Sequence, residues 1–217
     1  MPVRPQLRFV LPAVSIALAI ALVLAIVLDG APGGSGGSSS HSTAQSDGRS
    51  GAFDGAAFPA GVHTHDFTLA DQHGRSVSLS AYRGQVVALA FLSTDCRTCV
   101  LVAQQVRGAL DELGLAPSVR TIFVSTNPDA DTPASVSRFL SQTSLTGRVE
   151  YLTGTPKQLR PVWHAYGIPP ASAGKSASEA AAMVLLIDRA GAERVGFGLE
   201  QITPEGLAHD IRLLPAA

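Results

Sequence analysis

The chain has 217 residues, with 16 basic and 17 acidic side chains, and its formal net charge of −1 provides no electrostatic footprint for nucleic acid. Its length allows one ordinary domain with additional segments. The low share of charged residues, 15%, comes partly from the segments that precede this domain.

The chain begins with an apolar run that predicts a membrane anchor. Residues 9–28 carry no charge, Arg4 and Arg8 precede them, and Asp29 follows. A run of about 20 apolar residues can cross a bilayer as a helix. The two arginines place residues 1–8 in the cytoplasm, so we expect a single-pass protein of the cell membrane with its C-terminal domain on the extracytoplasmic side. The alternative is a cleaved signal peptide, although no convincing A-x-A cleavage pattern follows the run.

Residues 29–61 consist mainly of glycine, serine, alanine and scattered polar side chains. Such a composition cannot bury enough apolar surface to fold, so it predicts a flexible linker. Two roles are open for this linker. It either lets the folded domain, residues 62–217, reach a client at the membrane surface or only separates that domain from the membrane.

The folded domain shows alternating strand and helix patterns. The expected elements, in chain order, are a hairpin of residues 65–69 and 77–79, a strand of 86–92, a helix of 99–113, a strand of 119–125, a helix of 133–144 capped by Asp131 or Thr132, a strand of 149–152, a helix of 156–166, a hairpin of 182–188 and 193–199, and a helix from 204. Because β-α-β crossovers need parallel strands with covered faces, this order predicts an α/β fold, a mixed sheet with flanking helices.

The only two cysteines, Cys96 and Cys99, stand where the apolar strand of 86–92 gives way to a helix. Unpaired N–H groups and the positive end of the dipole at a helix N-terminus favour a thiolate there. We therefore expect the more exposed Cys96 to attack a client disulfide and Cys99 to resolve the product. Asp95, just before the pair, is expected to cap the helix. The C-x-x-C spacing in a βαβ context is typical of a thioredoxin-like fold.

Other interpretations of the two sulfurs remain open. Two thiolates form a soft pair that suits Cu(I), or Zn(II) if more ligands are supplied. The pair can also form a permanent structural disulfide with no chemistry.

Several segments between residues 65 and 214 resemble one protein family. They are Phe67-Thr68-Leu69, Asp71-Gln72-His73-Gly74, Tyr82-Arg83-Gly84, Asp131-Thr132-Pro133, Leu152-Thr153-Gly154-Thr155-Pro156 and Ala165-Tyr166-Gly167-Ile168. With them the chain resembles the Sco/SenC family, thioredoxin-fold proteins of the cell envelope and the mitochondrial inner membrane. Members of this family help to assemble the copper site of cytochrome oxidase, and a membrane anchor with an extracytoplasmic domain suits them.

The chain departs from the family where the family binds copper. The resemblance implies a C-x-x-x-C motif and a later histidine as copper ligands, but here the spacing is C-x-x-C. Counting back from Leu186 places the family histidine at or near Ala180, and no histidine lies between Ala165 and Gly206.

Other side chains were considered as replacements for that ligand. Met183 has a soft thioether and lies near the vacant position, but a methionine in a strand is more often core. His63 and His65 precede the first strand and are expected to be solvated. His164, beside a tryptophan on a helix, is expected to have a surface or packing role.

The sequence thus predicts an extracytoplasmic Sco/SenC-like protein that performs thiol-disulfide exchange through Cys96 and Cys99 in support of copper-protein assembly. Its expected partners are client thiols or disulfides, with a cytochrome oxidase subunit as one candidate. One alternative is a Cu(I) metallochaperone that uses the two thiolates and another ligand. A second alternative is a non-catalytic scaffold with a structural disulfide.

Overall fold

The computed structural model describes residues 52–114, 119–169 and 182–214. The predicted anchor, residues 9–28, lies outside these ranges, as do most of the predicted linker and the position near Ala180. Within the described ranges, no helix combines the length and the apolar character that a membrane span requires.

The central element is a six-stranded mixed sheet in the order β1-β8-β7-β4-β5-β6. Its strands are β1 (Ala56–Ala57), β4 (Val86–Leu92), β5 (Val119–Ser125), β6 (Glu150–Leu152), β7 (Met183–Ile187) and β8 (Glu193–Gly198). The strands β4, β5 and β6 are parallel, whereas β7 runs antiparallel to β4 and to β8. The sequence prediction of a mixed α/β sheet is confirmed.

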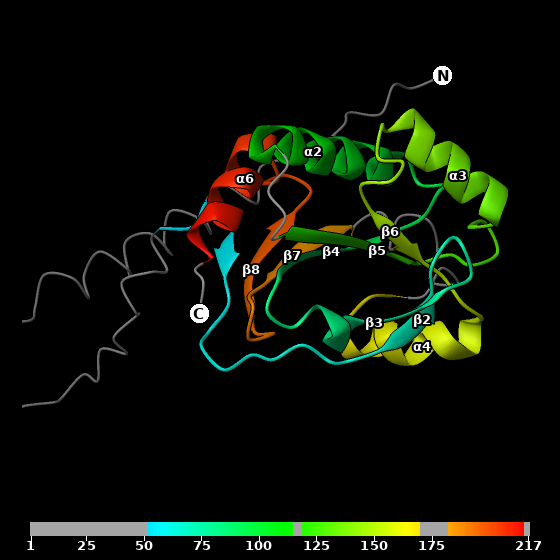
Figure 1. Ribbon diagram of the computed structural model, residues 1–217, viewed down its shortest axis with the longest axis horizontal. Coiled ribbons are helices and arrows are strands. Elements are labelled where there is room, and N and C mark those ends of the chain that lie inside the picture. Colours follow the sequence, from blue (N-terminus) through cyan, green and yellow to red (C-terminus); the bar gives the residue numbers. More distant parts are fainter. Residues whose placement is uncertain (1–51, 115–118, 170–181, 215–217) are drawn as a thin grey trace, which may run out of the picture. The chain divides into compact units, whose positions relative to one another are not determined.

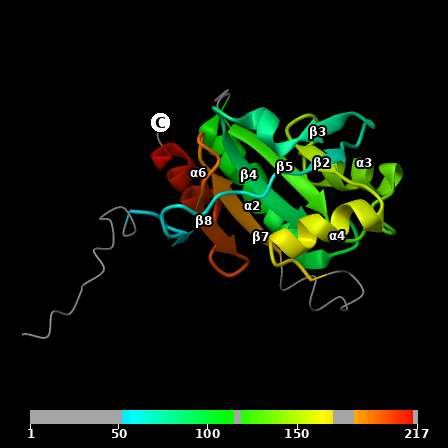
Figure 2. The ribbon, with the colours of Figure 1, turned by 90° about the horizontal axis from the view of Figure 1, so that it is seen from below.

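Helices cover both faces of this sheet (Figures 1 and 2). The helices α2 (Arg97–Leu113), α3 (Pro133–Gln142) and α6 (Pro204–Leu213) pack on one face. The other face is covered by α4 (Pro156–Ala165), by the small hairpin of β2 (Thr68–Ala70) and β3 (Ser76–Ser78), and by the 3₁₀ turn η1 (Leu79–Tyr82).

Strand β4 divides the core into two clusters. All seven of its residues are buried. Because side chains alternate along a strand, Ala88, Ala90 and Leu92 face the cluster beneath α2, α3 and α6. Leu89 and Phe91 face the opposite cluster beneath α4. A strand buried on both faces explains why its sequence is a continuous apolar run.

The N-terminal edge of the domain differs from the sequence prediction. Residues 56–57, which fall in the segment assigned to the linker, form β1 and pair with Gly196 and Val195 of β8. Phe53 and Phe58 flank this strand and pack against the two core clusters. Two alanines carry no strand pattern of their own, so the pairing depends on contacts with the edge of the sheet.

Threonine caps determine where the helices α3, α4 and α6 begin. Thr132, Thr155 and Thr203 each accept a hydrogen bond from a backbone N–H of the first turn, and a proline follows each threonine. Of the two caps considered for α3, Thr132 is therefore confirmed and Asp131 is wrong. Asp131 is 2% exposed, and its carboxylate turns inward to the site described below.

Candidate functional site

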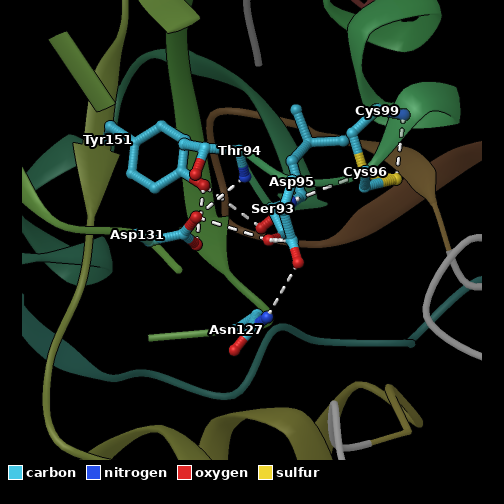
Figure 3. The surroundings of a disulfide bond; sticks show 9 residues. Ser93, Thr94, Asp95, Cys96, Cys99, Asn127, Asp131 and Tyr151 are labelled. Carbon is cyan, nitrogen blue, oxygen red and sulfur yellow. Dashed lines mark hydrogen bonds between the residues drawn. A yellow bond between two sulfur atoms is a disulfide. The ribbon is translucent and has the colours of Figure 1, made fainter. Parts of the chain in front are cut away.

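The two cysteines lie where β4 ends and α2 begins, at the carboxyl edge of the parallel strands. They are joined in a disulfide (Figure 3). Cys96 is the N-cap of α2, and its Sγ accepts a 3.0 Å hydrogen bond from the backbone N–H of Cys99. The prediction that the pair occupies a helix N-terminus is confirmed, with the helix starting at Arg97 rather than at Cys99.

Both cysteines are largely covered. Cys96 is 6% exposed and Cys99 is 1% exposed, so Cys96 is the more accessible of the two. The backbone N–H of Ser93, in the loop that precedes the helix, approaches Cys99 Sγ at 3.5 Å. The inner sulfur is thus enclosed, and an approaching thiol meets Cys96 first.

Asp95 does not cap α2, contrary to the sequence prediction. The cap is Cys96 itself, since its sulfur takes the N–H that a carboxylate would otherwise accept. The carboxylate of Asp95 instead accepts hydrogen bonds from the hydroxyl of Ser93 and, at 3.3 Å, from the side-chain amide of Asn127.

A buried carboxylate, Asp131, supports the loop that precedes the cysteines (Figure 3). It accepts hydrogen bonds from the backbone N–H of Thr94 at 2.7 Å, from the Ser125 hydroxyl at 2.5 Å and from the Tyr151 hydroxyl at 2.9 Å. The Ser93 hydroxyl lies 3.3 Å from the same carboxylate. Asp131 therefore connects the loop after β4 with the end of β5 and with β6.

Burial sets the protonation behaviour of this cluster. It raises the pKa of Asp131 above the ordinary aspartate value, and the hydrogen bonds from Ser125, Thr94 and Tyr151 oppose the rise without cancelling it. Burial, together with the charge of Asp131, also raises the pKa of Tyr151 well above its ordinary value. Tyr151 consequently remains a hydrogen-bond donor at neutral pH.

The sequence reasoning missed this supporting cluster. Ser93 and Ser125 are the polar residues that end two buried parallel strands, and the carboxyl ends of such strands meet at one edge of a sheet. The positions of these two serines in the sequence therefore indicated a polar cluster at that edge. The partnership of Asp131 with Tyr151 had no signal, because the two residues lie on separate elements, 20 positions apart.

The structure does not bring the other candidate ligands to the disulfide. Met183 packs in the cluster beneath α4, on the face of the sheet opposite the cysteines, so its predicted core role is confirmed. His63, His65 and His164 are exposed, as expected. In the described ranges, the one group of three histidine, cysteine or acidic side chains close enough together to hold a metal ion is Asp54, His209 and Asp210.

This arrangement can be compared with known proteins. The family model SCO1/SenC matches residues 57–214. The chain belongs to the SCO1/SenC family. It is 32% identical over 114 residues to the mitochondrial SCO2 homologue of Bos taurus and 31% identical to that of Homo sapiens, and each match covers 50% of this chain and 42% of the relative. The chain thus matches less than half of the length of these relatives.

Solved Sco structures share the fold. BsSco, a member of the Sco family of cytochrome c oxidase assembly proteins, is 21% identical, with a TM-score of 0.58 over 71% of this chain and 94% of its own. ScoI of Bradyrhizobium japonicum, solved with copper bound, is 25% identical, with a TM-score of 0.52 over 71% and 99%. A thioredoxin domain of a thiol-disulfide oxidoreductase from Bacteroides vulgatus is 14% identical, with a TM-score of 0.56 over 73% and 99%. The predicted thioredoxin-like fold is confirmed.

Proposed function

We propose that this SCO1/SenC protein performs thiol-disulfide exchange through Cys96 and Cys99 in support of copper-protein assembly, with a cytochrome oxidase subunit as a client. The observation that carries the proposal is the disulfide at the N-terminus of α2, where the N–H of Cys99 points at Cys96 Sγ. That N–H and the helix dipole would stabilise a thiolate on Cys96 when the bond is reduced.

The exchange proceeds in two steps with the pair as reductant. The Cys96 thiolate attacks one sulfur of a client disulfide, the client's other sulfur leaves as a thiolate, and a mixed disulfide forms. Cys99 then loses its proton, attacks Cys96 Sγ and expels the second client sulfur. The client has gained two electrons, the Cys96–Cys99 disulfide is restored, and a thiol reductant returns the pair to its starting state.

The supporting cluster gives the exchange its geometry. Asp131 accepts the N–H of Thr94, and the N–H of Ser93 approaches Cys99 Sγ. Two neighbouring residues of the loop before Cys96 are therefore held by hydrogen bonds. Only the outer sulfur is positioned for attack. A client disulfide is therefore expected to react with Cys96, with Cys99 behind it as the resolving thiol.

A trapping experiment tests the proposal. In the Cys99→Ser variant the second step cannot occur, so a mixed disulfide between Cys96 and the client should accumulate and be visible on a non-reducing gel. The Cys96→Ser variant is the matched control and should trap at least tenfold less. Equal trapping by both variants, or none by either, would contradict the proposed order of attack.

A second candidate function is the delivery of Cu(I) as cargo. Two thiolates one helical turn apart suit this soft ion, and the copper-bound relative at 25% identity favours the candidate. In the described ranges no histidine or acidic side chain forms a three-ligand group with the sulfurs, so a third ligand of this kind would come from a client or from another part of the chain. An anaerobic titration of the reduced protein with Cu(I) against a competing chelator, beside the Cys96→Ser/Cys99→Ser double variant, tests it. Tight, stoichiometric binding that the double variant loses would support delivery.

The third alternative is a structural disulfide without chemistry. It is favoured by the low exposure of the two cysteines, 6% for Cys96 and 1% for Cys99. Structural disulfides resist reduction and have potentials below about −300 mV, whereas exchange-active ones lie higher.

The proposed cellular setting keeps the sequence-based anchor. Residues 9–28 would hold the protein in the membrane, with residues 1–8 in the cytoplasm and the folded domain on the other side. Protection of the domain from external protease in sealed inside-out vesicles, and its digestion after lysis, would support this topology. Digestion of the domain in the sealed vesicles would contradict it.

A further inference from the structure

The charged residue next to the reactive sulfur is held in a fixed position. Asp95 is exposed, yet one of its carboxylate oxygens accepts a hydrogen bond from the Ser93 hydroxyl and the other accepts one from Asn127 Nδ2 at 3.3 Å (Figure 3). An exposed aspartate without such partners samples several rotamers. Two hydrogen bonds from two different segments restrict the carboxylate of Asp95, the residue before Cys96, to one region.

The residue that holds Asp95 also contacts the disulfide. The hydroxyl of Ser93 donates to Asp95, while its backbone N–H approaches Cys99 Sγ at 3.5 Å. Ser93 is 2% exposed, so it is fixed by the packing around it. The carboxylate and the sulfurs are therefore positioned by the same buried residue.

We propose that the Asp95 carboxylate lowers the reduction potential of the Cys96–Cys99 pair. The inference extends the proposed function, because it matters only if the pair undergoes redox exchange. Reduction of the disulfide consumes two electrons from a thiol reductant, and near neutral pH it leaves a thiolate on Cys96 and a proton on Cys99. The negative charge that develops on Cys96 is repelled by the fixed carboxylate one residue away. Asp95 thus favours the disulfide over the reduced form.

The other charged groups of the site either favour the Cys96 thiolate or are engaged in hydrogen bonds elsewhere. The N-terminus of α2 favours the thiolate, as does the cationic side chain of Arg97, which is exposed and makes no ion pair in the described ranges. The carboxylate of Asp131 is buried and accepts hydrogen bonds from three other donors, Thr94, Ser125 and Tyr151. Asp95, the residue directly before Cys96, carries an exposed negative charge that two hydrogen bonds hold in place.

The test is the redox equilibrium of the full-length protein with glutathione, measured for the wild type and for Asp95→Asn. Asparagine keeps the shape and an acceptor oxygen but removes the charge. The equilibrium constant for reduction should rise about fivefold, the order of magnitude expected when one nearby unit charge is removed in water. A tenfold change in this two-electron couple is 29.6 mV, so the potential should rise by about 20 mV.

Control variants separate charge from structure. Asp95→Glu restores the charge and should return most of the wild-type potential. Asp129→Asn removes an equal charge from an exposed site that makes no hydrogen bond to residues 93–96, and it should leave the potential unchanged. The difference between wild type and Asp95→Asn should shrink in about 1 M salt, where the Debye length is ~3 Å, because the carboxylate is exposed.

The measurement of the reduction potential needs no client protein, so its result is independent of the trapping experiment. An unchanged or lowered potential in Asp95→Asn would overturn the inference, and so would an equal rise in Asp129→Asn or in Asp95→Glu. Failure of the trapping experiment would instead count against the proposed exchange while leaving the measured effect of Asp95 intact.

Discussion

The hydroxyl of Tyr151 donates a 2.9 Å hydrogen bond to the carboxylate of Asp131, and both side chains are buried. The bond joins β6 to the loop that leads into α3. It places a titratable group with a raised pKa inside the core of the site.

The raised pKa of Asp131 predicts a pH dependence of stability. Because the native state holds this proton more tightly than the unfolded state, the contribution of Asp131 is most favourable below the ordinary aspartate pKa and declines as pH rises through its native pKa. The free energy of unfolding of the wild type minus that of Asp131→Asn should therefore fall with increasing pH. Urea unfolding of both proteins across the acidic range measures this difference, and a difference that increases with pH would contradict the assignment.

Reduction of the disulfide should leave the domain folded. The bond joins residues only three positions apart, so it restricts the unfolded chain little, and its loss should cost about 2 kcal/mol. The measurement compares urea unfolding and near-ultraviolet circular dichroism of the oxidised and reduced protein. Loss of the folded signal on reduction would instead indicate a structural disulfide.

The N-terminal strand depends on a buried carboxylate of α6. Asp210 is 0% exposed, and its two oxygens accept hydrogen bonds from the backbone N–H groups of Asp54 at 2.9 Å and Gly55 at 3.0 Å. Asp210→Ala should destabilise the domain by about 2 kcal/mol because two amides lose their acceptor. Amide hydrogen exchange of residues 53–58 should rise in this variant.

The matched control for that prediction is the neighbouring histidine. The side chain of His209 is 48% exposed and contacts the carboxylates of Asp54 at 3.2 Å and Asp210 at 3.0 Å. Contacts made by a half-exposed side chain contribute little, so His209→Ala should cost less than about 1 kcal/mol. Equal destabilisation by His209→Ala and Asp210→Ala would contradict the role given to the buried carboxylate.

The placement of Met183 predicts that it takes no part in copper handling. Its side chain packs on the face of the sheet opposite the cysteines. Met183→Leu should therefore leave any Cu(I) affinity of the reduced protein unchanged, whereas Cys96→Ser should reduce it at least tenfold. Competition with a Cu(I) chelator gives both values, and a loss of affinity in Met183→Leu would show that the thioether reaches the metal.

Some elements could be predicted from the sequence because their signals are local. The boundaries of β4 follow from a continuous apolar run and those of β5 from a β-branched segment, while threonine-proline caps give the starts of α3, α4 and α6. The site could be predicted only as far as the C-x-x-C pair at a helix start. The cap of α2 was assigned to Asp95 because carboxylates usually accept such N–H groups, whereas here the sulfur of Cys96 does so.

The remaining features depend on distant contacts that no local pattern records. β1 exists because residues 56–57 pair with β8, about 140 residues later in the chain by the sheet register. Asp131 was considered as a cap because it precedes Thr132 and Pro133, but its carboxylate is turned inward by donors from three other segments. Both cases show tertiary contacts overriding a local preference.

The central claim, exchange through Cys96 and Cys99, is tested most directly by the reduction potential of the pair in the full-length protein, measured at equilibrium with glutathione or dithiothreitol. We predict a potential above about −300 mV, in the range of exchange-active pairs. A value well below about −300 mV would place the pair among structural disulfides and contradict the proposed function.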